Sequence, residues 1–119
     1  MVRADGTWQF GDCPMKKTRL ANYWHPIAPA AEITDQPRAY TLLGEKIVTY
    51  RTKAGVAVPK DLCIHRGTAL SLGRVENGHI VCRYHAWRFD TSGKCVHIPS
   101  LPDGASIPKK ACVTAYRAE

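Results

Sequence analysis

Two short segments of this sequence each place one cysteine close to one histidine, and they constrain the fold more than any other feature. The first reads CIHRG at residues 63–67, the second reads CRYHAW at residues 82–87, and sixteen residues separate His65 from Cys82. A loop at the end of a strand can direct a thiolate and an imidazole to one point at either spacing. We therefore expect two loops that face each other and form one metal site, with Cys63, His65, Cys82 and His85 as its ligands.

The way these ligands are mixed indicates which metal they suit. A zinc finger commonly takes two cysteines from one knuckle and two histidines from another, whereas each loop here supplies one of each. Mixed loops that face each other let the two thiolates lie side by side and the two imidazoles lie side by side. That is the ligand set of a [2Fe–2S] cluster with two thiolates on one iron and two imidazoles on the other. A structural zinc site, in a module that binds nucleic acid through its basic charge, is the alternative.

The residues around these segments resemble a known family. Two stretches, CIHRGTALSLG from Cys63 and VENGHIVCRYHAWRFDTSGKCVHIPS from Val75, cover about a third of the chain and are similar to the Rieske family. The run YWHPIA at residues 23–28 fits the family more loosely. The likeness is greatest to the N-terminal domain of Rieske non-haem iron oxygenases, the ring-hydroxylating and O-demethylating enzymes. Respiratory Rieske proteins usually carry an extra cysteine in each loop, and neither loop here has one.

Three residues depart from the oxygenase pattern. Ile64 and Arg83 stand where proline is common, and Ala86 stands where glycine is common. We expect these departures to affect the rigidity of the loops and to leave ligation intact. If residue 86 requires a positive φ, alanine costs about 1 kcal/mol there.

The resemblance implies an all-β fold, a Rieske-type antiparallel β-sandwich whose tip is made by two cluster-binding loops. It implies one Rieske domain over residues 1–119, with the cluster-binding part at about residues 60–100 and without the C-terminal catalytic domain. It also implies a [2Fe–2S] cofactor and one-electron transfer from a reductase or ferredoxin to a mononuclear iron in a catalytic domain or neighbouring subunit. A stand-alone Rieske ferredoxin is the alternative to such an oxygenase component.

We expect this chain to contain no catalytic residues of its own. An oxygenase needs a mononuclear iron held by two histidines and a carboxylate, with open positions for oxygen. Besides the two ligand histidines the chain has His25, His79 and His97, and none of them lies in the D-x-x-H-x4-H pattern of that family. Aromatic or similar small apolar substrates are implied by the resemblance alone.

Turn residues divide the chain into short β-prone runs. Eight prolines and nine glycines disfavour long helices, and one helical turn is predicted, over residues 17–24. Strands are predicted at residues 38–43, 46–51, 56–62, 79–82, 94–98 and 111–118, with a turn at Gly44-Glu45 and another at residues 90–93. The Asn77-Gly78 pair predicts a type I′ hairpin, because both residues tolerate a positive φ. If the strand that ends at Ala118 stays unpaired, it leaves an open sheet edge.

The charge of the chain favours acidic partners. Seventeen lysines and arginines against ten acidic residues give a net charge of +7, which favours anionic surfaces without identifying one. Arg66, Arg83 and Arg88 bracket the two loops, where positive charge would favour a reduced cluster and attract an acidic electron carrier. Alternatively they are solvated, or they pair with carboxylates such as Asp61 and Asp90. The sequence shows no signal peptide or membrane-spanning run, which predicts a cytoplasmic protein.

The other cysteines and histidines are predicted to be structural. Cys95 and His97 repeat the C-x-H spacing, but they follow a turn and alternate like a strand, so we expect their side chains on one sheet face. Cys13 and Cys112 are expected to be small buried side chains or free thiols. His25 is expected to be packed among aromatic residues, while Tyr84 and Trp87 are expected to be lid or core residues near the cluster.

Overall fold

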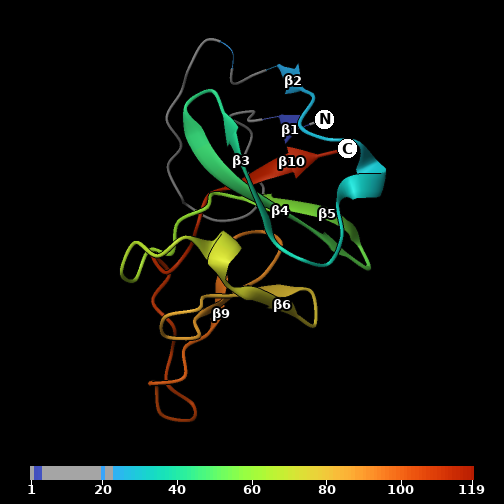
Figure 1. Ribbon diagram of the computed structural model, residues 1–119. Coiled ribbons are helices and arrows are strands. Elements are labelled where there is room, and N and C mark those ends of the chain that lie inside the picture. The colour runs from blue at the N-terminus through green and yellow to red at the C-terminus, as the bar shows by residue number, and fades with distance from the viewer. Residues whose placement is uncertain (1, 4–19, 21–22) are drawn as a thin grey trace.

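The computed structural model describes residues 2–3, 20 and 23–119, and these residues form two antiparallel β-sheets (Figure 1). The first sheet has the strand order β2-β1-β10-β5-β4-β3. Its strands are β1 (Val2–Arg3), β2 (Trp24–His25), β3 (Arg38–Leu42), β4 (Glu45–Thr52), β5 (Gly55–Pro59) and β10 (Ala115–Ala118). The second sheet has the order β6-β7-β8-β9. Its strands are β6 (Arg74–Glu76), β7 (His79–Val81), β8 (Arg88–Phe89) and β9 (Cys95–His97).

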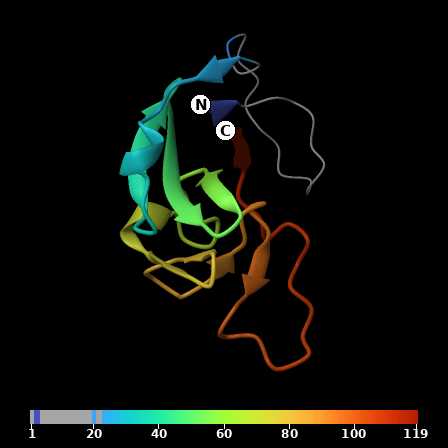
Figure 2. The same cartoon turned by 90° about the vertical axis from the view of Figure 1, so that its right-hand side faces the viewer.

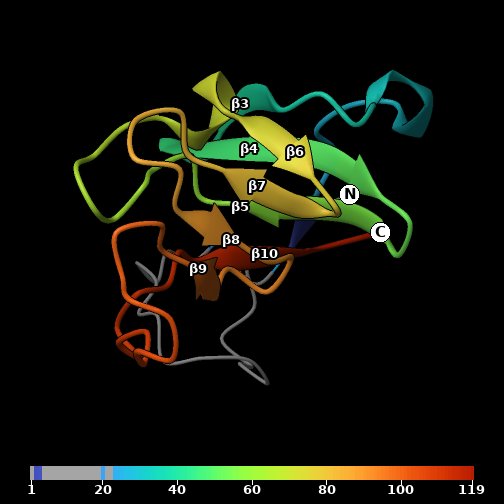
Figure 3. The ribbon, with the colours of Figure 1, turned by 90° about the horizontal axis from the view of Figure 1, so that it is seen from below.

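The two sheets stack face to face, and the main core lies between them. Seen from below, the small sheet lies across β4 and β5 (Figure 3). Val48 and Tyr50 of β4 pack in one cluster with Ile80 of β7 and Phe89 of β8, and all four side chains are fully buried. The predicted all-β sandwich is therefore confirmed.

Strand β4 is buried on both of its faces. Ile47 points away from the second sheet and packs with Val58, Tyr40 and Ile27 in a separate cluster. Residues 47–50 are consequently all buried. A strand covered on both faces has no exposed polar positions to alternate with its apolar ones, which is why this segment reads as a nearly continuous apolar run.

Tight turns join the strands close to where the sequence predicts them. Asn77 has a φ of 52° and Gly78 a φ of 77°, which confirms the type I′ hairpin between β6 and β7. The turn between β3 and β4 lies one residue earlier than predicted, because Leu43 and Gly44 are the residues with positive φ and Glu45 already belongs to β4. The turn at residues 90–93 is confirmed by a hydrogen bond of 3.0 Å from the Gly93 N–H to the Asp90 carbonyl.

The structure differs from two expectations, the open sheet edge at the last strand and the helical turn over residues 17–24. The last strand does not form an open edge, since β10 lies between β1 and β5. Residues 17–19, 21 and 22 of the predicted helical turn lie outside the described residues, and Trp24 begins strand β2 instead of ending a helix. The described helical segments are two 3-10 turns, η1 (Ala30–Glu32) and η2 (Leu70–Leu72). Within the described part of the chain, no helix has the length and apolar character needed to cross a membrane.

The connections on one side of the molecule position the candidate site. The loop after β5, residues 60–69, and the loop between β7 and β8, residues 82–87, project on the same side in two perpendicular views (Figures 1 and 3). The long segment between β9 and β10 extends away from both sheets (Figure 2). The two loops that carry the Cys and His residues are thus brought together by the sandwich, as the predicted two-loop tip requires.

Candidate metal centre

The two loops share one backbone construction. In the first, the Cys63 N–H donates to the Thr68 carbonyl at 2.8 Å and the Gly67 N–H donates to the Cys63 carbonyl at 2.8 Å. In the second, the Cys82 N–H donates to the Trp87 carbonyl at 2.9 Å and the Ala86 N–H donates to the Cys82 carbonyl at 3.0 Å. Each loop is therefore closed by the same pair of bonds, counted from its cysteine, and each fixes its cysteine at the base.

The fourth residue after each cysteine adopts the left-handed conformation. Gly67 has a φ of 73° in the first loop, and Ala86 has a φ of 57° in the second. Glycine takes this conformation without strain, whereas the Cβ of alanine crowds its own backbone there. Residue 86 therefore has the positive φ at which we expected alanine to be unfavourable. The backbone of the second loop is strained at this residue, whereas that of the first loop, with glycine, is not.

We expect Ala86→Gly to stabilise the protein. The substitution gives the second loop the residue that the first already has, so it should raise the free energy of unfolding by about 1 kcal/mol. Denaturant unfolding of the two proteins measures the change. Ala69→Gly is a control of the same chemistry, because Ala69 has a φ of −63° and glycine there should destabilise. A destabilised Ala86→Gly variant would show that the loop is not strained.

The two sulfur atoms lie together in the core. The Cys63 side chain is 1% exposed and the Cys82 side chain 2% exposed. Burial raises the pKa of the Cys63 thiol to about 11, and the neighbouring Cys82 adds to the rise, while the backbone N–H groups of His65 and Arg66 oppose it. The N–H groups that point at this sulfur would stabilise it as a thiolate once a metal supplies positive charge.

The two imidazoles also lie together, on the outer side of the sulfurs. The ring centroids of His65 and His85 are 4.7 Å apart, with an angle of 64° between the rings. His85 is exposed and His65 is half-buried. Partial desolvation lowers the pKa of His65, and the charges of His85 and Arg66 lower it further. We call the solvent-facing side formed by these two rings the histidine edge.

Aromatic side chains hold the two imidazoles differently. The Trp87 ring stacks on the His65 ring at a centroid distance of 4.4 Å and an angle of 9°. Tyr84 lies beside His85 at 3.9 Å with an angle of 48°, and it is 63% exposed. Trp87 is therefore a packing residue that fixes the orientation of His65, whereas Tyr84 belongs to the exposed surface.

The donor set fits a two-iron cluster better than a single ion. Like side chains are grouped in pairs, with two buried sulfurs and two more exposed imidazoles, which is the arrangement that a [2Fe–2S] cluster with mixed ligation requires. A single Zn²⁺ ion would need all four donors around one point. Among residues 2–3, 20 and 23–119, no three His, Cys, Asp or Glu side chains form a group that could hold one metal ion.

Asp61 anchors the first loop through contacts that the sequence did not predict. Asp61 is buried, and its carboxylate accepts hydrogen bonds of 2.7 Å from both the backbone N–H and the hydroxyl of Ser71. These bonds tie the start of the loop to η2. The sequence suggested Asp61 as a partner for arginine. A serine ten residues downstream gave no signal of this contact, because the loop between them has no regular periodicity.

The second C-x-H segment does not form a site, and the reason is a β-bulge. Phe89 pairs with Cys95 while Arg88 pairs with His97, so Val96 is an extra residue in β9. The bulge turns Cys95 into the core and leaves His97 exposed. The expectation that both side chains share one sheet face was therefore wrong, while the prediction that they are structural remains.

The remaining cysteines and histidines lie outside the loops. His25 is half-buried, and its Nε2 lies 2.9 Å from the Leu20 carbonyl. His79 begins strand β7. Cys112 is disulfide-bonded, which corrects the expectation of a free thiol. Cys13 lies outside the described residues.

The three arginines near the loops differ in their contacts. Arg88 forms an ion pair of 2.9 Å with Glu76 and not with Asp61 or Asp90. The Asp90 carboxylate instead accepts bonds from Ser92 and Lys94 within its own turn. Arg66 and Arg83 are exposed and form no ion pair with a carboxylate of residues 23–119.

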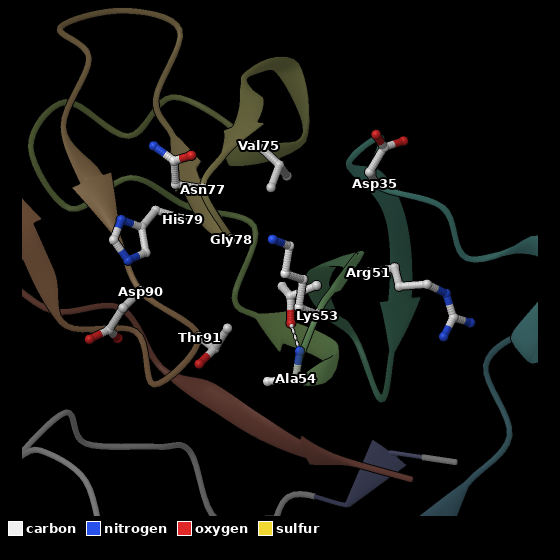
Figure 4. Close-up of a pocket in the computed structure, with 11 residues that line it drawn as sticks. Asp35, Arg51, Lys53, Ala54, Val75, Asn77, Gly78, His79, Asp90 and Thr91 are labelled. Atoms are coloured by element: carbon white, nitrogen blue, oxygen red, sulfur yellow. Dashed lines mark hydrogen bonds between the residues drawn. The ribbon is translucent and has the colours of Figure 1, made fainter.

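An open groove lies at the far end of the sandwich from the two loops. It has a volume of about 770 Å³ and lies between the β4–β5 turn and the β6–β7 turn. Figure 4 shows Lys53 pointing into it, with Asp35 on one side and His79 near Asp90 on the other. Charges of both signs line the groove and no cysteine does, so it is separate from the candidate metal centre.

One protein family matches most of this chain. The family model described as the Rieske [2Fe-2S] domain matches residues 23–116. The alpha subunit of phenoxybenzoate dioxygenase from Ectopseudomonas oleovorans is 43% identical over 88 residues, covering 71% of this chain and 21% of that protein. Aminopyrrolnitrin oxygenase PrnD from Pseudomonas fluorescens is 43% identical over 111 residues, covering 84% of this chain and 30% of that protein.

A solved structure of a similar protein has the same fold. NdmA of Pseudomonas putida CBB5 matches with a TM-score of 0.76 and 34% identity, over 82% of this chain and 31% of that chain. The chain therefore spans between 21% and 31% of the length of these three proteins.

Proposed function

The chain belongs to the Rieske [2Fe-2S] domain family, and on this basis we propose that it transfers single electrons as the Rieske domain of a ring-hydroxylating or demethylating oxygenase component. Its cofactor is a [2Fe–2S] cluster, as the sequence predicted. The observation that carries the proposal is the pairing of like ligands at the tip, with Cys63 beside Cys82 and His65 beside His85.

In this proposal Cys63 and Cys82 bind one iron, and His65 and His85 bind the other. A bound [2Fe–2S] cluster supplies a centre that takes up and releases one electron. The two thiolates balance the two positive charges of the oxidised core, and the neutral imidazoles add no charge. The histidines thus leave the site two charges more positive than four thiolates would, which raises the reduction potential to roughly −150 to +300 mV from about −400 mV.

The burial of the ligands supports an electron path through the histidine edge. Cys63 and Cys82 lie in the dry core, where surrounding side chains exclude water. His85 is exposed and His65 is half-buried, so the imidazoles are the part of the centre that a partner can approach. Stacked Trp87 keeps the His65 ring in a fixed orientation while a partner docks.

We propose a reductase or ferredoxin as the electron donor and a mononuclear iron in a catalytic domain or neighbouring subunit as the acceptor. The relatives support this, since they include the alpha subunit of a dioxygenase and an oxygenase. Residues 1–119 would form a single Rieske domain with its cluster-binding part at about residues 60–100. Catalytic residues for oxygen chemistry would then come from outside this segment.

The proposal predicts a coloured, redox-active protein. Purified from cells grown with iron, it should be red-brown, lose much of its visible absorbance on reduction with dithionite, and show the electron paramagnetic resonance signal of a reduced [2Fe–2S] cluster. Its reduction potential should lie within roughly −150 to +300 mV. A colourless protein that contains zinc would refute the proposal, and a potential near −400 mV would refute the assignment of the histidines.

A further inference from the structure

The two loops of the candidate metal centre are held at their ends in different ways. Val81 of β7 pairs with Arg88 of β8, so a strand ladder closes the second loop at its base. The first loop leaves β5 and enters η2, and no ladder of the described strands joins its two ends. Cys63 is the one buried residue between Asp61 and Leu70, so packing of the loop itself does little to fix it.

The Asp61 carboxylate closes the first loop where strand pairing is missing. Its Oδ1 accepts a hydrogen bond of 2.7 Å from the Ser71 N–H, and its Oδ2 accepts one of 2.7 Å from the Ser71 hydroxyl. The carboxylate is buried, and a buried polar group is costly to leave without its hydrogen bonds. These two bonds join residues on either side of Cys63 and His65, so they restrict where both of these side chains can lie.

The turn η2 and the glycine after it also contact the base of the second loop. Leu70 of η2 is fully buried in the same core cluster as Cys82. Gly73 lies directly on the backbone of Val81, since a Cβ at Gly73 would lie 2.0 Å from the Val81 carbonyl oxygen. Val81 is the residue before Cys82. One short segment therefore contacts the bases of both loops.

We propose that Asp61 is a positioning residue for the cluster and that, through Ser71 and Gly73, it sets the distance between the two ligand loops. In the proposed function, on which this inference rests, each loop gives one ligand to each iron. A shift of the first loop would therefore move a thiolate on one iron and an imidazole on the other. Loss of an outer-shell contact that orients ligands commonly costs about 10- to 100-fold in metal affinity or activity.

Two substitutions of Asp61 separate its hydrogen bonds from its charge. Asp61→Ala removes both. Asp61→Asn removes the charge but keeps both contacts, because the amide oxygen accepts from the Ser71 N–H and the amide nitrogen donates to the Ser71 hydroxyl, which can also accept. The inference predicts that the asparagine variant behaves like the parent protein and the alanine variant does not.

The first measurement is the rate at which an iron chelator removes iron from the oxidised protein. At a temperature well below the unfolding midpoint, iron leaves through local opening of the loops and not through global unfolding. Asp61→Ala should release iron about tenfold faster than the parent, Ser71→Ala about threefold faster, and Asp61→Asn at a rate within about twofold of the parent. The serine variant has the smaller effect because the backbone N–H bond to Asp61 remains.

The second measurement is the electron paramagnetic resonance spectrum of the reduced protein. The spectrum of a [2Fe–2S] cluster depends on the geometry of the ligands around both irons. A first loop that takes several positions gives several geometries, so Asp61→Ala should broaden the lines. Asp61→Asn should keep the line widths of the parent protein.

Asp90→Ala is the matched control for these variants. The Asp90 carboxylate also accepts hydrogen bonds from the backbone N–H and the hydroxyl of one serine, Ser92, but it does so in the β8–β9 turn. This variant should lower the free energy of unfolding. It should leave the rate of iron release within about twofold of the parent and the line widths unchanged.

The outcomes separate this inference from the proposed function. If Asp90→Ala has the same effects as Asp61→Ala, general stability explains both and the positioning role is wrong. If Asp61→Asn behaves like Asp61→Ala, the charge matters instead of the contacts, which also contradicts the inference. If Asp61→Ala does not fold, Ser71→Ala decides, and parental iron release and line widths in that variant would refute the inference. A parent protein without a reducible cluster would refute the proposed function itself.

Discussion

Replacing Cys63 or Cys82 with alanine is expected to remove almost all iron from this protein. Each substitution deletes one of the two thiolates that we assign to the same iron, and water cannot replace a thiolate in a core where both side chains are at most 2% exposed. Because ligand binding and folding are coupled at metal sites, the loops should also lose stability. Iron content should fall at least about tenfold, together with the visible absorbance.

Cys95→Ala is the matched control for these variants. Cys95 is also a buried free cysteine in the same core cluster, but it belongs to strand β9 and not to either of the two loops. It should lose some stability through the cavity that it creates and still bind iron. Circular dichroism establishes that each variant is folded. Full iron content in a folded Cys63→Ala variant would show that the ligand assignment is wrong.

Gly93→Ala is expected to be the most destabilising alanine substitution among the described glycines. A Cβ at this position would lie 1.9 Å from the Val113 carbonyl oxygen, and the residue has a φ of 86°. Two costs therefore add, the overlap with a backbone atom and the strain of a left-handed alanine. We expect a loss of about 4 kcal/mol or more, which is a large part of the stability of about 5–15 kcal/mol of a small domain.

Two other glycines separate these costs. Gly104 has a φ of 81°, and no atom of another described residue would come within 4 Å of a Cβ at this position, so Gly104→Ala should cost about 1 kcal/mol from backbone strain alone. Gly73 has a φ of −88°, but a Cβ there would lie 2.0 Å from the Val81 carbonyl oxygen, so Gly73→Ala reports the overlap alone. Denaturant unfolding measures the free energy of unfolding of the three alanine variants. A Gly93→Ala variant no less stable than Gly104→Ala would contradict the close packing of the β8–β9 turn on Val113.

The fold class and the strands β3, β4, β5, β7, β9 and β10 were predictable because local signals and the family resemblance agree. The predicted strand ranges did not include β1, β2, β6 or β8. Strand β4 reads as an apolar run because both of its faces are buried, and Asn77-Gly78 forms the hairpin that its tolerance of positive φ predicts. The bulge at Val96 was not predictable, because no residue type there requires an extra residue in the strand. A shift of one residue then moved His97 to the exposed side.

The sequence predicted which four side chains lie together at the candidate site, and their role as ligands stays a prediction, but it did not predict the contacts that support them. Spacing and residue type predict that Cys63, His65, Cys82 and His85 lie together. In the structure the two cysteines are neighbours and the two histidines are neighbours. The stacking of Trp87 on His65 depends on the tertiary arrangement of two loops. Periodicity carries no information on such a contact between irregular segments.

The ion-pair partners of the arginines near the loops could not be predicted from the sequence either. Arg88 was one of three equivalent arginines in the sequence, and only the pairing of β6 with β7 and of β7 with β8 brings it to Glu76. That contact leaves Arg66 and Arg83 as the two exposed charges near the loops without a carboxylate partner among residues 23–119. The difference in ion pairing among the three arginines is therefore a result of the fold.

Electron–nuclear double resonance on the reduced protein, labelled with ¹⁵N-histidine, tests the central claim most directly. Two cysteines on one iron and two histidines on the other predict couplings from two distinct histidine nitrogens, contributed by His65 and His85. A reduced cluster that shows no strong histidine coupling, or only one, would contradict that ligand set.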